Sequence, residues 1–152
     1  MPALHCRPWA KTNRSPKSSF PAAIRSFTTA AAQKSRTLTA SYAMGWAQVA
    51  VGDLDGARKS FTAVLDARKD HIGAQVGIAE TIADSTAQEN EVLSILARKD
   101  LAKGDPRAVA RGWTLAGDDA HRAGRNDAAR DDYRKALAVD ADCVPALVGT
   151  AE

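Results

Sequence analysis

The sequence of 152 residues has few aromatic residues and no long apolar run. Aromatic side chains make up 5% of the chain although hydrophobic residues make up 45%, so alanine supplies much of the apolar content. Because a β-sandwich core depends on β-branched and aromatic side chains, this composition favours closely packed helices. No apolar stretch approaches the ~18 residues that a membrane-spanning helix requires, so no membrane span is expected.

Cysteine and the motifs of common enzymes are also scarce. Cys6 and Cys143 lie far apart with no CxxC pairing, which indicates neither a zinc site nor a disulfide scaffold, and both are expected to be free thiols. The sequence contains no P-loop, GxGxxG, HExxH, GxSxG or paired-carboxylate arrangement. We therefore expect no enzyme, no catalytic residue, no cofactor and no metal site.

Acidic residues are missing from the first third of the chain. Residues 1–52 carry seven Lys or Arg and no Asp or Glu, whereas all 18 acidic residues lie further along. Residues 1–19 hold three of the six prolines and show no hydrophobic period. Such a segment cannot bury enough apolar surface to offset its ordering entropy, so we expect a disordered basic leader.

Three interpretations of this basic front stay open. A segment rich in Arg, Ser and Ala without acids is typical of an organellar transit peptide, which would cover residues 1–36. A flexible leader is the simpler alternative. A tail that touches nucleic acid is the least favoured, because few aromatic residues stand among its basic ones. We expect a soluble protein, with a cytoplasmic location favoured and an organellar one if residues 1–36 are a transit peptide.

One pattern of small and aromatic residues occurs twice in the chain. Residues 111–140 predict two short antiparallel helices joined by a tight turn at Gly124. Helices that cross closely need small residues at the contact, because Cβ atoms limit the approach of the backbones. In the two copies, Gly45, Gly52, Ala57, Phe61 and Val64-Leu65 match Gly117, Gly124, Ala129, Tyr133 and Ala136-Leu137.

With Trp113 and Ala116, this set resembles the tetratricopeptide repeat, a helix-turn-helix unit with a 34-residue period. The resemblance implies an all-α fold, a right-handed superhelical solenoid of antiparallel helix pairs. The array would cover residues 20–152, namely a partial repeat at 20–37, repeats at 38–71, 72–105 and 106–143, and a partial helix at 144–152.

Start and stop signals predict the individual helices. Gly104-Asp105-Pro106 ends one helix and caps the next. The middle repeat departs from the period, because Glu91 stands 34 residues after Ala57, where the family has alanine. An extra helical turn or a longer loop is expected there. The expected helices span residues 20–34, 39–51, 54–67, 72–83, 88–103, 106–123, 126–139 and 144–152.

The resemblance also implies a function. First helices of successive tetratricopeptide repeats line a concave groove that holds a peptide or helix of a partner protein. The expected function is therefore a protein-interaction scaffold; an accessory segment of a larger enzyme or signalling protein, or an organelle-imported assembly factor, are the alternatives. The candidate partner-binding residues are Tyr42, Trp46, Val49, Glu80, Arg111, Thr114, Asp118 and His121.

Some of these residues have more than one interpretation. Trp46 is either an aromatic anchor for a partner or a packing residue, whereas Trp113 is expected in the core. The carboxylate clamp of one tetratricopeptide subfamily is incomplete, since Arg111 is the one basic residue at the matching positions. Asp118, Asp119, His121 and Arg122 are expected on a solvated helix face with local ion pairs.

The last helix suggests an additional property. Repeat arrays need polar end caps, and the segment with Pro145, Leu147 and Val148 does not provide one. Two alternatives are therefore expected: an exposed apolar end that self-associates, or a native protein that is longer than this sequence.

Overall fold

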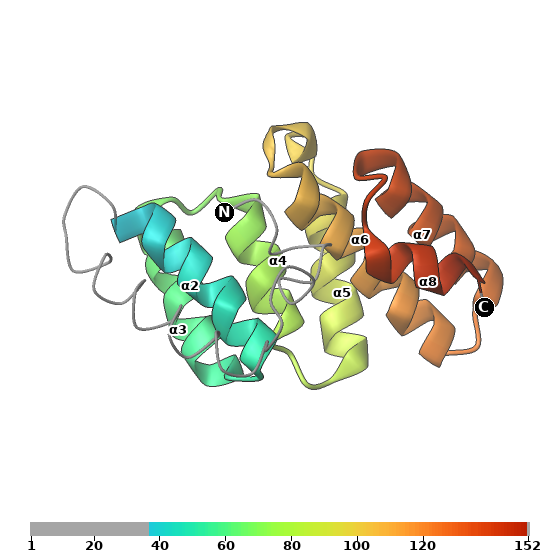
Figure 1. Ribbon diagram of the computed structural model, residues 1–152, viewed down its shortest axis with the longest axis horizontal. Helices are drawn as coiled ribbons and strands as arrows, with labels where there is room; N and C mark the ends of the chain where they lie inside the picture. Colours follow the sequence, from blue (N-terminus) through green and yellow to red (C-terminus); the bar gives the residue numbers. More distant parts are fainter. Residues whose placement is uncertain (1–36, 152) are drawn as a thin grey trace, which may run out of the picture.

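The computed structural model describes residues 37–151, which form an all-α fold of helices packed in antiparallel pairs (Figure 1). The expected leader over 1–19 and the expected helix over 20–34 lie outside the described residues. The α-helices are α2 (Thr37–Val51), α3 (Leu54–Ala67), α4 (Ile72–Glu80), α5 (Ser85–Leu96), α6 (Pro106–Arg122), α7 (Asn126–Val139) and α8 (Val144–Ala151), with a 3-10 turn η2 (Leu101–Lys103) before α6.

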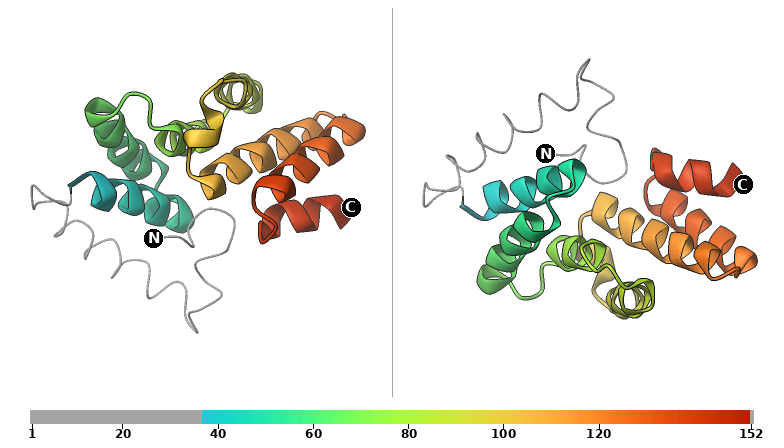
Figure 2. Two further views of the ribbon diagram at one scale, coloured as in Figure 1. Left: turned by 90° about the horizontal axis from the view of Figure 1, so that it is seen from above. Right: turned by 90° about the horizontal axis from the view of Figure 1, so that it is seen from below.

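The helices follow one another from one end of the molecule to the other. Figure 2 shows α2 and α8 toward one side of the molecule, with α3 and α5 toward the opposite side. The packing contacts run mainly between neighbours in the chain, with α6 also against α4 and α8. An elongated molecule results, in which each helix covers the apolar face of the next.

Two glycines set the turns inside the first and last helix pairs. Gly52 and Gly124 have φ angles of +82° and +75°, a left-handed conformation that a side chain disfavours. Each glycine leads into the same bond pattern: the amide of Asp53 donates to Gln48 O at 2.9 Å, and that of Arg125 to Ala120 O at 2.8 Å. The bounds predicted for α3 and α7 are confirmed.

Side-chain acceptors fix the starts of the other helices. Oδ1 of Asp84 accepts from the amide of Ala87 at 2.8 Å at the start of α5. Oδ1 of Asp105 accepts from the amide of Arg107 at 3.1 Å, with Pro106 in the first helical position of α6. Nδ1 of His71 takes the same role for Ala74 at the start of α4. Each cap satisfies an amide that the helix itself leaves without a partner.

The core of the first three helices is built around one aromatic ring. Phe61 of α3 is fully buried, with Gly45 of α2 on one side and Gly77 of α4 on the other. A Cβ atom at Gly45 would lie 2.6 Å from Phe61 Cε1, and one at Gly77 would lie 2.5 Å from Cε2. Both glycines are therefore required by close approach of the helices.

The last three helices hold a second ring in the same way. Tyr133 of α7 lies between Gly117 of α6 and Gly149 of α8, where Cβ atoms would come within 2.6 Å and 2.5 Å of the ring. Each of these residues follows its counterpart by 72 positions, as α7 follows α3. We refer to α2, α3 and α4 as the first triplet and to α6, α7 and α8 as the second triplet.

The sequence placed Gly45 and Gly117 against alanine, and the structure adds a closer neighbour. Ala57 and Ala129 are buried as expected, but the atoms nearest to each glycine belong to the aromatic ring one turn further along. The larger core cluster runs from α2 to α6 and a smaller one joins α6, α7 and α8. Trp113 packs against both clusters, as expected of a structural tryptophan.

The middle of the chain differs from the prediction. Helix α4 ends at Glu80 instead of residue 83, and α5 spans Ser85–Leu96 instead of 88–103. Side chains from other helices donate to the carbonyl oxygens at the end of α4: Arg58 Nη2 donates to Thr81 O at 3.0 Å, and Gln88 Nε2 donates to Ala79 O at 3.0 Å. These partners replace the next helical turn, so α4 stops early.

Candidate functional site

The three predicted residues of α2 lie against the protein's own core. Trp46 is 2% exposed, and its ring meets that of Phe61 edge to face, with centroids 5.3 Å apart. Tyr42 is partly buried and donates from its hydroxyl to Asp105 Oδ2 at 3.3 Å. Val49 is also partly buried against the same core cluster. Of the two interpretations of Trp46, a partner anchor or a packing residue, this geometry matches the packing residue.

Glu80 and Arg111 form an ion pair between α4 and α6. Arg111 Nε lies 3.1 Å and 3.0 Å from the two carboxylate oxygens of Glu80, and its Nη2 donates to Oε1. The side chains are 20% and 12% exposed for Arg111 and Glu80 respectively, so water screens the pair only in part. The pair joins the first triplet to the second.

Thr114 lies inside the protein. It is fully buried, and its hydroxyl donates to Ala110 O at 2.9 Å, with Cys143 Sγ 3.5 Å away. A partner therefore cannot contact it in this structure. Cys143 is also fully buried, and its sulfur is disulfide-bonded, so the expectation of a free thiol at this position is wrong.

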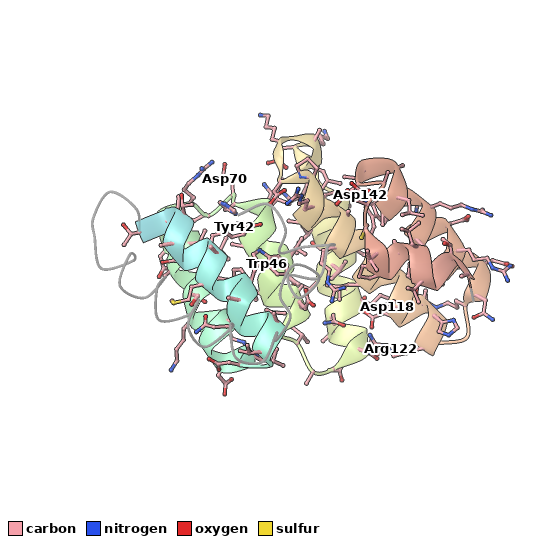
Figure 3. The ribbon with its side chains drawn as sticks, in the orientation of Figure 1. Tyr42, Trp46, Asp70, Asp118, Arg122 and Asp142 are labelled. Atoms are coloured by element: carbon pink, nitrogen blue, oxygen red, sulfur yellow. The ribbon has the colours of Figure 1, made fainter. Side chains whose placement is uncertain are left out.

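Asp118 and His121 both line an open pocket between α6 and α8. The pocket has a volume of about 290 Å³. Asp118 Oδ1 accepts a hydrogen bond of 2.7 Å from the Tyr133 hydroxyl at its edge. Asp118 and Arg122 are labelled where they project beside α8 in Figure 3. The lining residues are Asp118, His121, Arg122, Tyr133, Pro145, Val148 and Gly149.

The sequence selects two of these seven residues, Asp118 and His121, as partner-binding residues and misses the rest. It predicts Tyr133 at the helix contact and gives Val148 and Gly149 no site role. The signal that could have found them is the 72-residue correspondence, since they are equivalent to Phe61, Val76 and Gly77, which pack in the core of the first triplet. We call the pocket lined by Asp118, Tyr133 and Val148 the α6–α8 pocket.

The expectation of a solvated face is wrong for Asp119, which is 4% exposed. Its Oδ1 lies 2.8 Å from Arg122 Nη2, a local pair on one helix. Burial raises the pKa of the Asp119 carboxyl, and the negative charges of Glu89 and Asp118 act in the same direction, against the guanidinium of Arg122. Glu89 in turn lies 2.5 Å from Arg125 Nη2.

A second pocket, of about 260 Å³, lies where the α3–α4 and α5–α6 connections meet. Tyr42 reaches its edge, and Asp70, also labelled in Figure 3, lines it with basic residues beside it. His71 lines the pocket too, and its pKa lies below the usual value because of burial and the nearby Arg68. Acids and bases alternate here, so the pocket has no dominant charge. Its ionisable lining residues are Arg68, Asp70, His71, Asp100, Lys103 and Asp105.

Among residues 37–151, no group of three or more His, Cys, Asp or Glu side chains is placed to hold a metal ion. The same residues include no helix long and apolar enough to cross a membrane. The acid that lines the α6–α8 pocket, Asp118, accepts a hydrogen bond from Tyr133. The chemistry that this arrangement offers is the recognition of a hydrogen-bond donor.

The C-terminal end of the described helices exposes apolar side chains, as the sequence predicts. Val148 is 56% exposed, Leu147 is 48% exposed and Val139 is 40% exposed. Self-association through this end remains a prediction. Comparison with protein-family models gave no match, and searches of curated proteins and of solved structures found no similar protein.

Proposed function

We propose that this chain is a tetratricopeptide-like scaffold that binds a peptide or helix of another protein along the side of α2, α4, α6 and α8. The proposal assigns it no catalytic step. The recurrence of one glycine–aromatic–glycine contact in both triplets supports a repeat origin for the fold. Stacked helix pairs of this kind leave an extended surface along their first helices.

One observation carries the binding role: the α6–α8 pocket is open and is lined by Asp118 and His121, two residues that the groove hypothesis selects independently of the pocket. Small-molecule enzymes usually enclose their ligands in deeper sites with convergent polar groups. An open pocket on the first helices is better suited to side chains of a macromolecular partner.

A random peptide library displayed on phage tests the proposal with the full-length chain as bait. Enriched peptides would be synthesised and titrated into isotope-labelled protein, and their contact surface mapped by NMR. The proposal expects shifted amides on α2, α4, α6 and α8. Selection of no peptide, or of peptides whose contacts lie on α3, α5 and α7, would contradict it.

A charge reversal provides the matched variants. Asp118→Lys should weaken binding of the selected peptides by about tenfold or more, because the carboxylate acceptor is replaced by an ammonium group that cannot accept a hydrogen bond. Asp131→Lys makes the same change on α7, where the Asp131 side chain is 65% exposed, and should leave binding unaltered. Equal losses in both variants would indicate a general charge effect instead of a site.

A further inference from the structure

The two triplets differ at several equivalent positions, and one of these pairs bears on the α6–α8 pocket. Trp46 of α2 and Asp118 of α6 are 72 residues apart, as are Phe61 and Tyr133. In the first triplet the Trp46 indole is buried against Phe61 and belongs to the same core cluster as Val76. In the second triplet the shorter carboxylate of Asp118 takes that place, and the α6–α8 pocket lies beside it.

The valines at the equivalent positions of α4 and α8 also differ in exposure. Val76 of α4 is fully buried, while its counterpart Val148 of α8 is 56% exposed and lines the α6–α8 pocket. Helices α5 and α6 contribute to the burial of Val76, because Gly112 and Leu96 pack beside it. The Trp46 ring nevertheless shows that an aromatic group can pack beside the central ring of a triplet.

From this correspondence we infer that the α6–α8 pocket receives a tryptophan side chain of the partner peptide, in the place that Trp46 fills in the first triplet. The inference rests on the proposed function and names the chemistry that the site would recognise. A pocket of about 290 Å³ is large enough, since a cavity of about 150 Å³ already admits a benzene ring.

The polar atoms of the pocket fit an indole. Oδ1 of Asp118 accepts from the Tyr133 hydroxyl at 2.7 Å, which leaves Oδ2 as the acceptor that we assign to the indole N–H. The Tyr133 ring and the Val148 side chain offer the apolar contacts. A hydrogen bond to a charged acceptor adds more than one between neutral groups.

The charges around Asp118 favour a neutral donor over a cationic one. Arg122 lines the same pocket; its Nη2 pairs with Asp119 at 2.8 Å and its Nε donates to the backbone oxygen of Asp118 at 3.3 Å. An arginine from a partner would meet this guanidinium at close range. An indole N–H brings no charge and can bond to the carboxylate without that repulsion.

The test uses N-acetyl-tryptophanamide, titrated into the full-length labelled protein and followed by NMR. The inference expects saturable shifts at the amides of Asp118, His121 and Val148, with no such shifts from N-acetyl-alaninamide. The N1-methylated indole analogue, which has no N–H to donate, should bind about tenfold more weakly. This comparison uses the unaltered chain and does not depend on the folding of a variant.

Two variants complete the test. Asp118→Trp should fill the pocket with its own indole and abolish the shifts, and Asp131→Trp, which adds an indole on the exposed side of α7, should preserve them. Equal binding of the methylated and unmethylated probes, shifts confined to other helices, or tighter binding of N-acetyl-argininamide would each overturn the inference.

Failure here is distinguishable from failure of the scaffold proposal. If phage selection yields peptides that bind the first helices but contain no tryptophan in the α6–α8 pocket, the scaffold role stands and the tryptophan assignment fails. If no peptide is selected while N-acetyl-tryptophanamide binds the pocket, the assignment stands and the peptide groove fails.

Discussion

The two triplets hold an aromatic ring in the same frame but surround it differently. Phe61 is covered by Trp46 and Tyr42, with ring centroids 5.3 Å and 6.2 Å away. Its side chain carries no polar atom. Tyr133 carries a hydroxyl that bonds to Asp118 and lies at the edge of an open pocket. One backbone arrangement thus supports a closed core in one place and a polar recess in the other.

The contrast distinguishes residues that both triplets share from a residue at which they differ. The glycines that let the helices approach are shared by both triplets, so they belong to the frame. The difference between Trp46 and Asp118 changes what fills the frame without changing the helix bounds of α3 and α7. The residue at this position is therefore where a function can vary while the fold is kept.

Truncation at the two equivalent positions gives the largest expected contrast. Trp46→Ala removes a buried aromatic side chain and should lower the free energy of unfolding by about 3–5 kcal/mol. Asp118→Ala removes one partly buried hydrogen bond with Tyr133 and should cost about 1 kcal/mol. Urea unfolding of both variants measures the difference. An unchanged stability for Trp46→Ala would instead support Trp46 as a partner anchor.

The ion pair between the triplets comes next. Arg111→Ala leaves the Glu80 carboxylate, which is 12% exposed, without its guanidinium and should cost about 2–4 kcal/mol, less than a fully buried pair. Arg134→Ala, at an exposed pair on α7, should cost about 0–0.5 kcal/mol. Urea titrations monitored by circular dichroism would compare them. Equal small losses would mean that the Glu80–Arg111 pair does not couple the triplets.

Substitution of Gly77 and of Gly149 should lower stability by different amounts although both glycines contact an aromatic ring. In Gly77→Ala the new methyl group meets Phe61, which cannot move away without striking Gly45, and a loss of about 1–3 kcal/mol is expected. Gly149→Ala presses on Tyr133, but α8 has fewer helices against it and can shift, so about half that loss is expected. Thermal melts of the two variants decide, and a larger effect at Gly149 would contradict this interpretation.

Asp119 makes the second triplet sensitive to pH. Its pKa is raised by burial, so the carboxyl binds a proton more readily in the folded chain than in the unfolded one. The stabilising effect of that proton is complete below the unfolded pKa and is lost as the pH rises through the folded pKa. Asp119→Asn should therefore melt higher than the parent at pH 7 and approach it as the pH falls toward 4. A variant less stable at every pH would show that the Arg122 pair outweighs the burial.

His71 makes the first triplet respond to pH in the opposite direction. Its pKa is lowered by burial and by Arg68, and its Nδ1 must be unprotonated to cap α4. This contribution is present above the unfolded pKa of about 6.5 and is lost as the pH falls through the folded pKa. His71→Asn keeps a capping side chain without titrating. Between pH 7 and pH 5 it should lose less stability than the parent in urea titrations; equal losses would assign the effect to other groups.

The sequence predicts most of the helix pairs but not the middle of the chain. Gly52 and Gly124 take a conformation that few other residues accept, so the turns and helices around them were predictable from local signals. The end of α4 depends on Arg58 and Gln88, which come from other helices. Contacts of that range leave no local pattern, so the expected helix over 72–83 was too long.

The candidate site follows the same division. Asp118 and His121 could be selected by their register on α6, because helical spacing tells which residues share a face. Thr114 is selected by the same spacing yet is fully buried, and it contacts Cys143 of the α7–α8 connection, a neighbour that the spacing of α6 does not reveal. The α6–α8 pocket also depends on Val148 and Gly149 of α8, which tertiary packing brings to the same pocket as Asp118.

The crystal structure of the Asp118→Trp variant tests the equivalence of the two triplets most directly. The account predicts that the introduced indole lies against the Tyr133 ring and the Val148 side chain, as Trp46 lies against Phe61, and that the pocket is filled. An indole that points into solvent, with the pocket still open, would contradict it.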